Sequence, residues 1–184
     1  GKLYMVSDVL LMGGYWYNEE IFKRAGVTKF PGTWEEWLDV CEKIKNLDGQ
    51  TIPVILDANH MAYLMTTILA DENLAELENI RNSKINVYSP AFDKMLEQLR
   101  EISTYAALAG NYNYRDTLAS FNAGESAIYI NGVWANSMID EELQVSYAPF
   151  PSNDGNGIAT RSACVGYILG NTGDEKRMEA SIKF

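Results

Sequence analysis

The hydrophobic and polar positions along the chain follow two periods, about 3.6 and about 2 residues, which predicts helices interleaved with short strands. Helical spacing occurs over residues 19–25, 34–48, 61–69, 73–80, 90–109, 116–122 and 133–142 and from residue 174 onward. Strand-like runs cover residues 3–6, 10–17, 51–56, 126–131, 145–148 and 164–169, with a break at residues 7 and 8. This interleaving is typical of an α/β layered architecture.

The helix predicted over residues 34–48 has the clearest local signals in the chain. Thr33 and Glu36 form a capping box at its start, and Gly49 ends it. Its apolar face comprises Trp34, Trp37, Leu38, Cys41 and Ile44. The long helix over residues 90–109 has a similar stripe, formed by Phe92, Met95, Leu96, Leu99 and Ile102. We expect both stripes to be buried.

The sequence "PFPSNDGNG", residues 149–157, is the best candidate for a linker because proline and glycine gather there. The last predicted helix has begun an apolar face with Met178 and Ile182 when the sequence reaches Phe184. We therefore expect the chain to be a fragment of a longer protein.

Composition and charge narrow the classes of partner. The chain has 184 residues, 47% of them hydrophobic, and a formal net charge of −10. Such a charge disfavours nucleic acid and anionic membrane surfaces, because phosphates would be repelled, and favours a neutral or cationic small ligand. The two cysteines, Cys41 and Cys164, form neither a disulfide scaffold nor a metal-site spacing, and Cys41 lies on an apolar helix face.

The residues that catalysis requires are sparse. The carboxylates gather at three predicted helix ends, residues 19–20, 35–36 and 140–142, where complementing the helix dipole explains them. His60 is the only histidine, and the sequence has no nucleophile-elbow or phosphate-loop motif. We expect no catalytic residue, no metal site and no cofactor.

One corner of the chain is suited to a ligand. Trp134 follows Gly132 where a predicted strand turns into a helix, and ligands of α/β sheets bind at such corners. An indole face complements the C–H groups of a sugar ring, although core packing would also explain Trp134. The pairs Asn59–His60 and Asn113–Tyr114 fall at similar corners; each is either a plain surface loop or part of one shared rim.

Four stretches, taken in order, resemble a known family. They are "GKLYMVSDVLLMGGYWYNEEIFKRAGV", "PGTWEEWLDVCEKI", "FNAGESAIYINGVWANSMID" and "VSYAPFPSNDG". Together they resemble the family 1 extracellular solute-binding proteins of bacterial ABC transporters, the maltose-binding-protein-like group. The resemblance implies a periplasmic-binding-protein-like type II fold, with helices layered around a short-stranded mixed sheet. It places residues 1–148 in the second lobe of a two-lobed protein, and residues 149–184 in a return crossing toward the first lobe.

The resemblance also implies ligand-binding residues. Trp134 matches the family's sugar-stacking tryptophan, and Tyr114 falls where a second aromatic residue lines the cleft. The remaining candidates are Asn59, His60, Asn113, Gly132 and Met12. Met12 lies in the segment 10–14, which is apolar here but polar in many members, and this departure leaves the identity of the ligand open.

The function implied is that of a solute-capturing component of an ABC importer for a mono- or oligosaccharide. Its partner would be a membrane permease, and the intact protein would be periplasmic or lipid-anchored outside the cytoplasmic membrane. A receptor domain that presents a solute to a sensor protein is the alternative, and a carbohydrate-active enzyme is disfavoured. Peptides, polyols and phosphodiesters remain open as ligands. Residues 10–12 are expected to expose apolar groups and to promote self-association of the fragment.

Overall fold

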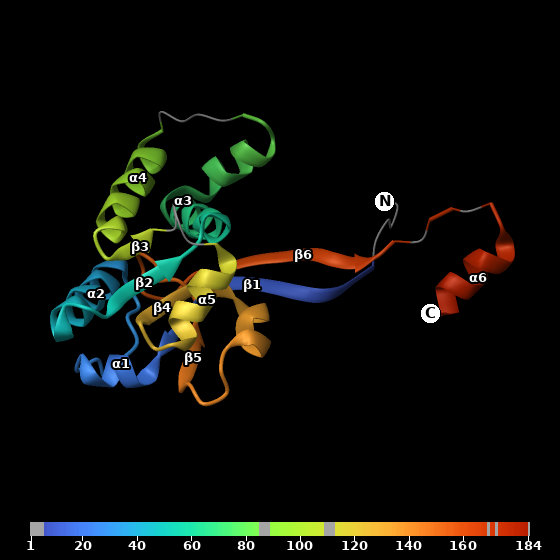
Figure 1. Cartoon of the computed structure of the whole chain (residues 1–184). Helices are drawn as coiled ribbons and strands as arrows, with labels where there is room; N and C mark the ends of the chain where they lie inside the picture. The colour runs from blue at the N-terminus through green and yellow to red at the C-terminus, as the bar shows by residue number, and fades with distance from the viewer. Residues whose placement is uncertain (1–5, 85–88, 109–112, 169, 172, 184) are drawn as a thin grey trace. The chain divides into compact units, whose positions relative to one another are not determined.

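The computed structural model describes all residues except 1–5, 85–88, 109–112, 169, 172 and 184 (Figure 1). The elements are β1 (Val6–Asn18), α1 (Glu19–Arg24), α2 (Trp34–Asp48), β2 (Ile52–Leu56), α3 (Ala58–Arg81), α4 (Pro90–Ser103), β3 (Ala106–Leu108), α5 (Tyr114–Asn122), β4 (Ser126–Gly132), the 3₁₀ helix η1 (Val133–Met138), β5 (Val145–Ala148), β6 (Thr160–Tyr167) and α6 (Glu175–Lys183). The chain forms two compact units. Unit 2 is Gly13–Thr160, and unit 1 combines Gly1–Met12 with Arg161–Phe184.

A mixed sheet runs through the elements and confirms the predicted α/β class. The strand order is β3-β2-β4-β1-β5, with β6 paired to β1. β2 is parallel to both β3 and β4, whereas β1 is antiparallel to β4 and β5. The antiparallel register of β1 and β4 places Gly13 opposite Gly132, so the two glycines face each other across neighbouring strands.

The sheet of unit 2 is covered on both faces, and its strands therefore alternate between two cores. Side chains of one parity, such as Tyr15 and Ile128, join a core with α1, α2, α3 and α4. Their neighbours Trp16 and Tyr129 point to the opposite face, where Phe121 of α5 and Ala135 of η1 cover them. A period of two residues thus sorts adjacent aromatic residues into different layers.

Local signals fix α2 as expected. Thr33 and Glu36 form the capping box, with Oε2 of Glu36 accepting N–H bonds from Gly32 at 2.7 Å and Thr33 at 3.3 Å, and Gly49 adopts a left-handed conformation at the end. The first of these bonds is the main reason that the pKa of Glu36 lies below its usual range. The buried face comprises Trp34, Trp37, Val40, Cys41 and Ile44, while Leu38 is only half-buried.

Other sequence predictions are wrong in detail. β1 continues through the break predicted at residues 7 and 8, and part of the strand predicted at 3–6 lies outside the described residues. α4 ends at Ser103 rather than near 109, and Leu96 of its predicted stripe is 40% exposed. The short strand β3 follows α4 and was not predicted, since only its pairing with β2 defines it.

The start of α3 changes the reading of the polar stretch before it. Asp57 caps the helix by accepting the backbone N–H groups of Asn59 and His60, so both residues lie in the first helical turn rather than in a loop. The two helices predicted over 61–69 and 73–80 form one element that is interrupted at Asn73, where φ is −162° and ψ is 99°. The polar stretch is therefore a helix N-terminus.

The stretch 149–157, predicted as a linker, instead folds onto unit 2. Phe150 is 1% exposed and pairs with Ile158 through two backbone hydrogen bonds. The N–H of Ser152 donates to the carbonyl of Gly32 at 3.0 Å, and the N–H of Asn153 donates to Asp71 at 2.8 Å. These contacts reach α3 and the approach to α2, so this loop belongs to the packed body.

Candidate ligand-binding site

Four aromatic rings gather where β2 and β4 end. They are His60 and Tyr63 of α3, Tyr114 of α5 and Trp134 of η1, and we call them the site cluster. Because β2 and β4 are parallel, their carboxyl ends share one edge of the sheet, and α3 and η1 both begin there. Apart from the local pair His60 and Tyr63, the residues of the site cluster are 20 or more positions apart in the sequence.

The imidazole of His60 is the centre of the site cluster. Its centroid lies 5.7 Å from the ring of Tyr114, 5.8 Å from Tyr63 and 6.2 Å from Trp134. Tyr63 and Trp134 also contact each other at 5.8 Å. His60 is only 5% exposed, whereas the three rings around it are half-buried. The centre of the site cluster is therefore buried, and its outer rings are partly accessible to solvent.

Two facing glycines, Gly13 and Gly132, lie under the rings of the site cluster, and we call them the glycine seat. A Cβ on Gly132 would lie 2.0–2.4 Å from three ring atoms of Trp134, so the indole lies directly over that backbone. A Cβ on Gly13 would lie 3.2 Å from the ring of Tyr63 and 2.2 Å from Oγ1 of Thr160. The absence of two side chains thus lets the rings approach the strands.

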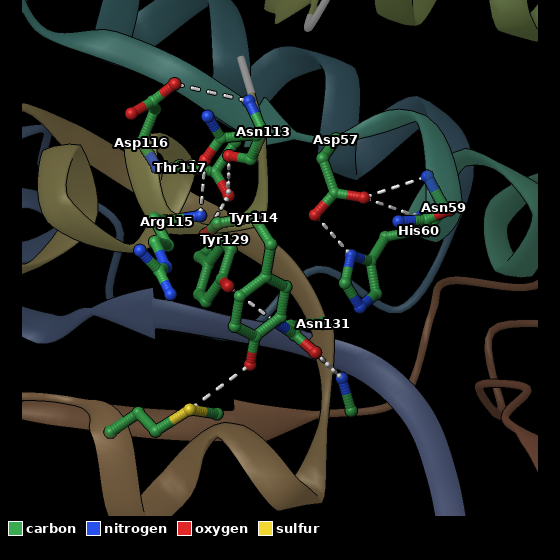
Figure 2. A network of polar contacts seen from close by, with 12 residues as sticks. Asp57, Asn59, His60, Asn113, Tyr114, Arg115, Asp116, Thr117, Tyr129 and Asn131 are labelled. Atoms are coloured by element: carbon green, nitrogen blue, oxygen red, sulfur yellow. Dashed lines mark hydrogen bonds and ion pairs between the residues drawn. The ribbon is translucent and has the colours of Figure 1, made fainter.

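Asp57 holds His60 in place (Figure 2). The carboxylate is 2% exposed, and its Oδ2 lies 2.7 Å from Nδ1 of the imidazole. Its Oδ1 accepts the backbone N–H of Asn59 at 2.8 Å and of His60 at 3.2 Å. One carboxylate therefore both caps α3 and orients the histidine ring.

A second polar network, which includes Tyr129 and Asn131 (Figure 2), supports the backbone that precedes Trp134. Asn131, buried at 1% exposure, donates to the hydroxyl of Tyr129 and accepts the N–H of Gly132 at 2.7 Å. The indole N–H of Trp16 donates to the carbonyl of Gly132 at 3.0 Å. Burial raises the pKa of Tyr129 well above its ordinary value. Both backbone polar groups of Gly132, the N–H and the carbonyl, are therefore hydrogen-bonded, and this fixes the backbone before Trp134.

The other candidates occupy different positions. Asn113 is exposed and caps α5 in a capping box with Asp116, while the hydroxyl of Tyr114 donates to Sδ of Met138 at 3.4 Å. The side chain of Asn59 is exposed and makes no hydrogen bond to any residue described by the structure. Met12 is 37% exposed and belongs to unit 1.

Two residues of the site were missed in the sequence. Asp57 precedes an apolar helical pattern, which is the usual position of a capping residue. Tyr63 lies three positions after His60, the spacing that places two side chains on one face of a helix. Both signals were present, but they require the start of α3 to be placed correctly.

The described part of the chain holds no group of three or more histidine, cysteine, aspartate or glutamate residues that could bind a metal ion. Within the same residues, no helix has the length and apolarity that a membrane span needs. Cys41 is a buried free thiol, as expected, and burial raises its pKa. The side chain of Cys164 lies outside the described residues.

Solved structures with the same fold cover the whole chain. A "Chitin oligosaccharide binding protein" aligns with a TM-score of 0.83 and 24% identity over 100% of this chain and 50% of that chain. "SBP RafE in complex with raffinose" aligns with a TM-score of 0.80 and 20% identity over 99% of this chain and 51% of that one. These likenesses show the fold.

Sequence comparison identifies the family. The "Multiple sugar-binding protein" of Streptococcus mutans is 26% identical over 205 residues, covering 100% of this chain and 47% of the relative. An uncharacterized ABC transporter extracellular-binding protein of Pyrococcus horikoshii is 21% identical over 145 residues, covering 75% and 34%. The chain thus spans half or less of the length of these relatives. The family model "Bacterial extracellular solute-binding protein" matches residues 7–180, and the chain belongs to this family.

Proposed function

We propose that this chain forms the sugar-facing part of a solute-binding protein that delivers a mono- or oligosaccharide to an ABC importer. The half-buried indole of Trp134, which lies over Gly132 at the carboxyl edge of the sheet, is the observation that carries this proposal. An indole in this position offers a rigid flat face to the C–H groups of a pyranose ring. The relatives named for chitin oligosaccharide, raffinose and multiple sugars support a carbohydrate as the ligand class.

The surrounding rings supply the rest of a sugar site. Tyr63 and Tyr114 extend the aromatic surface on two sides, and Asn59 and Asn113 add exposed amides at the helix N-termini of the same edge. Apolar faces combined with a few polar groups are the usual composition of a small-molecule site. We assign residues 1–148 to the second lobe of the intact protein and residues 149–184 to a return crossing toward its first lobe. Met12 would lie in the segment that connects the two lobes.

The proposed role is capture rather than catalysis. The carboxylates at residues 19–20, 35–36 and 140–142 are exposed, and Asp57, which contacts the one histidine, also caps α3. In the intact protein, closure of a first lobe over the sugar would create the surface that the permease recognises. That protein would act outside the cytoplasmic membrane, in the periplasm or on a lipid anchor. Apolar exposure at Met12 would favour self-association of this chain when isolated.

The test is calorimetric titration of the full-length protein with a panel of mono- and oligosaccharides. Trp134→Ala should weaken binding at least tenfold, because losing about 1.4 kcal/mol of stacking corresponds to one order of magnitude in Kd. Trp34→Phe, which changes a buried tryptophan of α2, is the matched control and should leave Kd unchanged. A sugar that binds both Trp134→Ala and the natural protein equally would contradict the proposed site, and binding of peptides or polyols alone would contradict a carbohydrate ligand.

A further inference from the structure

We propose that His60 determines which hydroxylated ligands bind, by presenting its Nε2 atom as a hydrogen-bond acceptor whose protonation is fixed by Asp57. The inference rests on the proposed sugar site and specifies its chemistry. His60 would be the polar contact that complements stacking on Trp134, and Asp57 would be a positioning residue.

The contacts of Asp57 determine the tautomer. A carboxylate can only accept hydrogen bonds, so the 2.7 Å contact between Oδ2 and Nδ1 requires the proton to be on Nδ1 of His60. The other oxygen, Oδ1, is held by the backbone N–H groups of Asn59 and His60. Rotating the carboxylate away would uncap α3, and the proton therefore stays on Nδ1. In the neutral imidazole, this tautomer leaves the lone pair on Nε2.

This lone pair is available to a ligand. Nε2 makes no hydrogen bond to any residue that the structure describes, and it points away from Asp57 (Figure 2). The rings of Tyr63 and Trp134 lie within 25° and 30° of the imidazole plane. With the residue 5% exposed, little water reaches the ring, so a donor from the ligand would be worth more here than at an open surface.

The ligand chemistry follows from this arrangement. A ring that stacks on Trp134 should carry a hydroxyl group that donates to Nε2 of His60. An analogue without that hydroxyl would leave the acceptor unpaired, and sites built around a hydrogen bond discriminate strongly against such analogues. A sugar phosphate should be rejected as well, because Nε2 accepts rather than donates and the carboxylate of Asp57 lies on the far side of the same ring.

Two substitutions separate the anchor from the acceptor. His60→Asn keeps an amide N–H near the position of Nδ1 but has no atom at Nε2, whereas His60→Gln extends an amide toward Nε2. Using the full-length protein and the sugar with the highest affinity, we expect His60→Asn to raise Kd at least tenfold and His60→Gln to restore part of the loss. The monodeoxy analogue that lacks the donating hydroxyl should bind natural protein and His60→Asn equally.

A spectroscopic measurement tests the role of Asp57 independently of affinity. The ¹⁵N imidazole signals of His60, assigned by their absence in His60→Asn, should show the proton on Nδ1 in the natural protein. In Asp57→Asn the amide still caps α3, but its N–H₂ group can donate to Nδ1 and shift the proton to Nε2. We expect that variant to keep its thermal stability and to lose affinity.

The outcomes are distinguishable from those of the proposed function. If Trp134→Ala abolishes sugar binding while His60→Asn binds as tightly as the natural protein, the sugar site stands and the role of His60 is overturned. A proton on Nε2 in the natural protein overturns it as well. If no sugar binds the natural protein, the proposed function falls, and this inference falls with it.

Discussion

Unit 2 contains two aromatic clusters whose ring geometry is nearly the same. The buried cluster, which we define as Tyr15, Trp34, Trp37 and Phe150, has ring centroids 5.9–6.3 Å apart, and the site cluster has centroids 5.7–6.2 Å apart. Spacing therefore does not distinguish a structural cluster from a functional one. Their exposure and polar partners do.

The buried cluster is closed to solvent. Tyr15 is 0% exposed and Trp37 and Phe150 are each 1% exposed, and burial raises the pKa of Tyr15 well above its ordinary value. Trp34 directs its indole N–H to Asp71 at 3.1 Å. The site cluster has the opposite arrangement. The polar pair of Asp57 and His60 is buried at its centre, and the other aromatic rings lie around this pair. A buried polar centre surrounded by half-buried rings supports the proposed site, since folding alone would favour the opposite arrangement.

The largest expected difference between the clusters is in stability. Trp37→Ala should lower the free energy of unfolding by about 3–5 kcal/mol, because it removes a fully buried indole and leaves a cavity. Trp134→Ala removes a ring that is only half-buried and should cost about 1 kcal/mol. Urea denaturation without ligand measures both. Equal losses would mean that Trp134 is a core residue, and the contrast between the clusters would disappear.

A smaller effect tests whether the glycine seat positions Trp134. Gly132→Ala would place a methyl group within 2.0–2.4 Å of the indole, so the ring must move. We expect a cost of about 1–3 kcal/mol, typical of overpacking, and a clear loss of sugar affinity. Gly170→Ala is the matched control, because its added Cβ would meet nothing within 4 Å among the described residues. Unchanged affinity in Gly132→Ala would show that ligand contacts do not depend on this seat.

The elements best predicted from the sequence are those defined by local contacts. The capping box of Thr33 and Glu36 and the left-handed Gly49 bound α2 as expected, since both signals act within a few residues. The strand β3 was missed because three residues, Ala106–Leu108, carry no period of their own and form a strand only through β2. The exposure of Leu96 also depends on which elements pack nearby.

The same distinction applies to the site. Trp134 and Tyr114 stand out in the sequence as aromatic residues at corners, and the structure brings their rings to His60. Their binding roles remain predictions. Opposed glycines on two strands could not be predicted, because the register of Gly13 with Gly132 joins positions that no local pattern links. Residues whose position depends on local structure can be found in a sequence. Residues whose position depends on the register between strands cannot.

The smallest expected effect concerns the loop that closes the buried cluster. Phe150 lies at the start of this loop, and Asp154 holds the loop together by accepting bonds from the hydroxyl of Ser152 at 2.6 Å and from Asn156. These bonds, led by that of Ser152, lower the pKa of Asp154 from 3.8 to about 2. Because the folded pKa lies below the unfolded value, the stabilisation is complete above about pH 4 and is lost as the pH falls toward 2.

Asp154→Asn should therefore reduce the acid dependence of the thermal midpoint between pH 5 and pH 2.5, with only a small change at pH 7, since the group is exposed. Glu78→Gln alters the charge by the same amount at an exposed position on α3 and is the control. Thermal scans that follow the near-ultraviolet signal of the buried tryptophans would measure both. If the two variants show the same acid dependence, the loop does not contribute to closing the buried cluster through Asp154, and the apolar packing of Phe150 alone holds it in place.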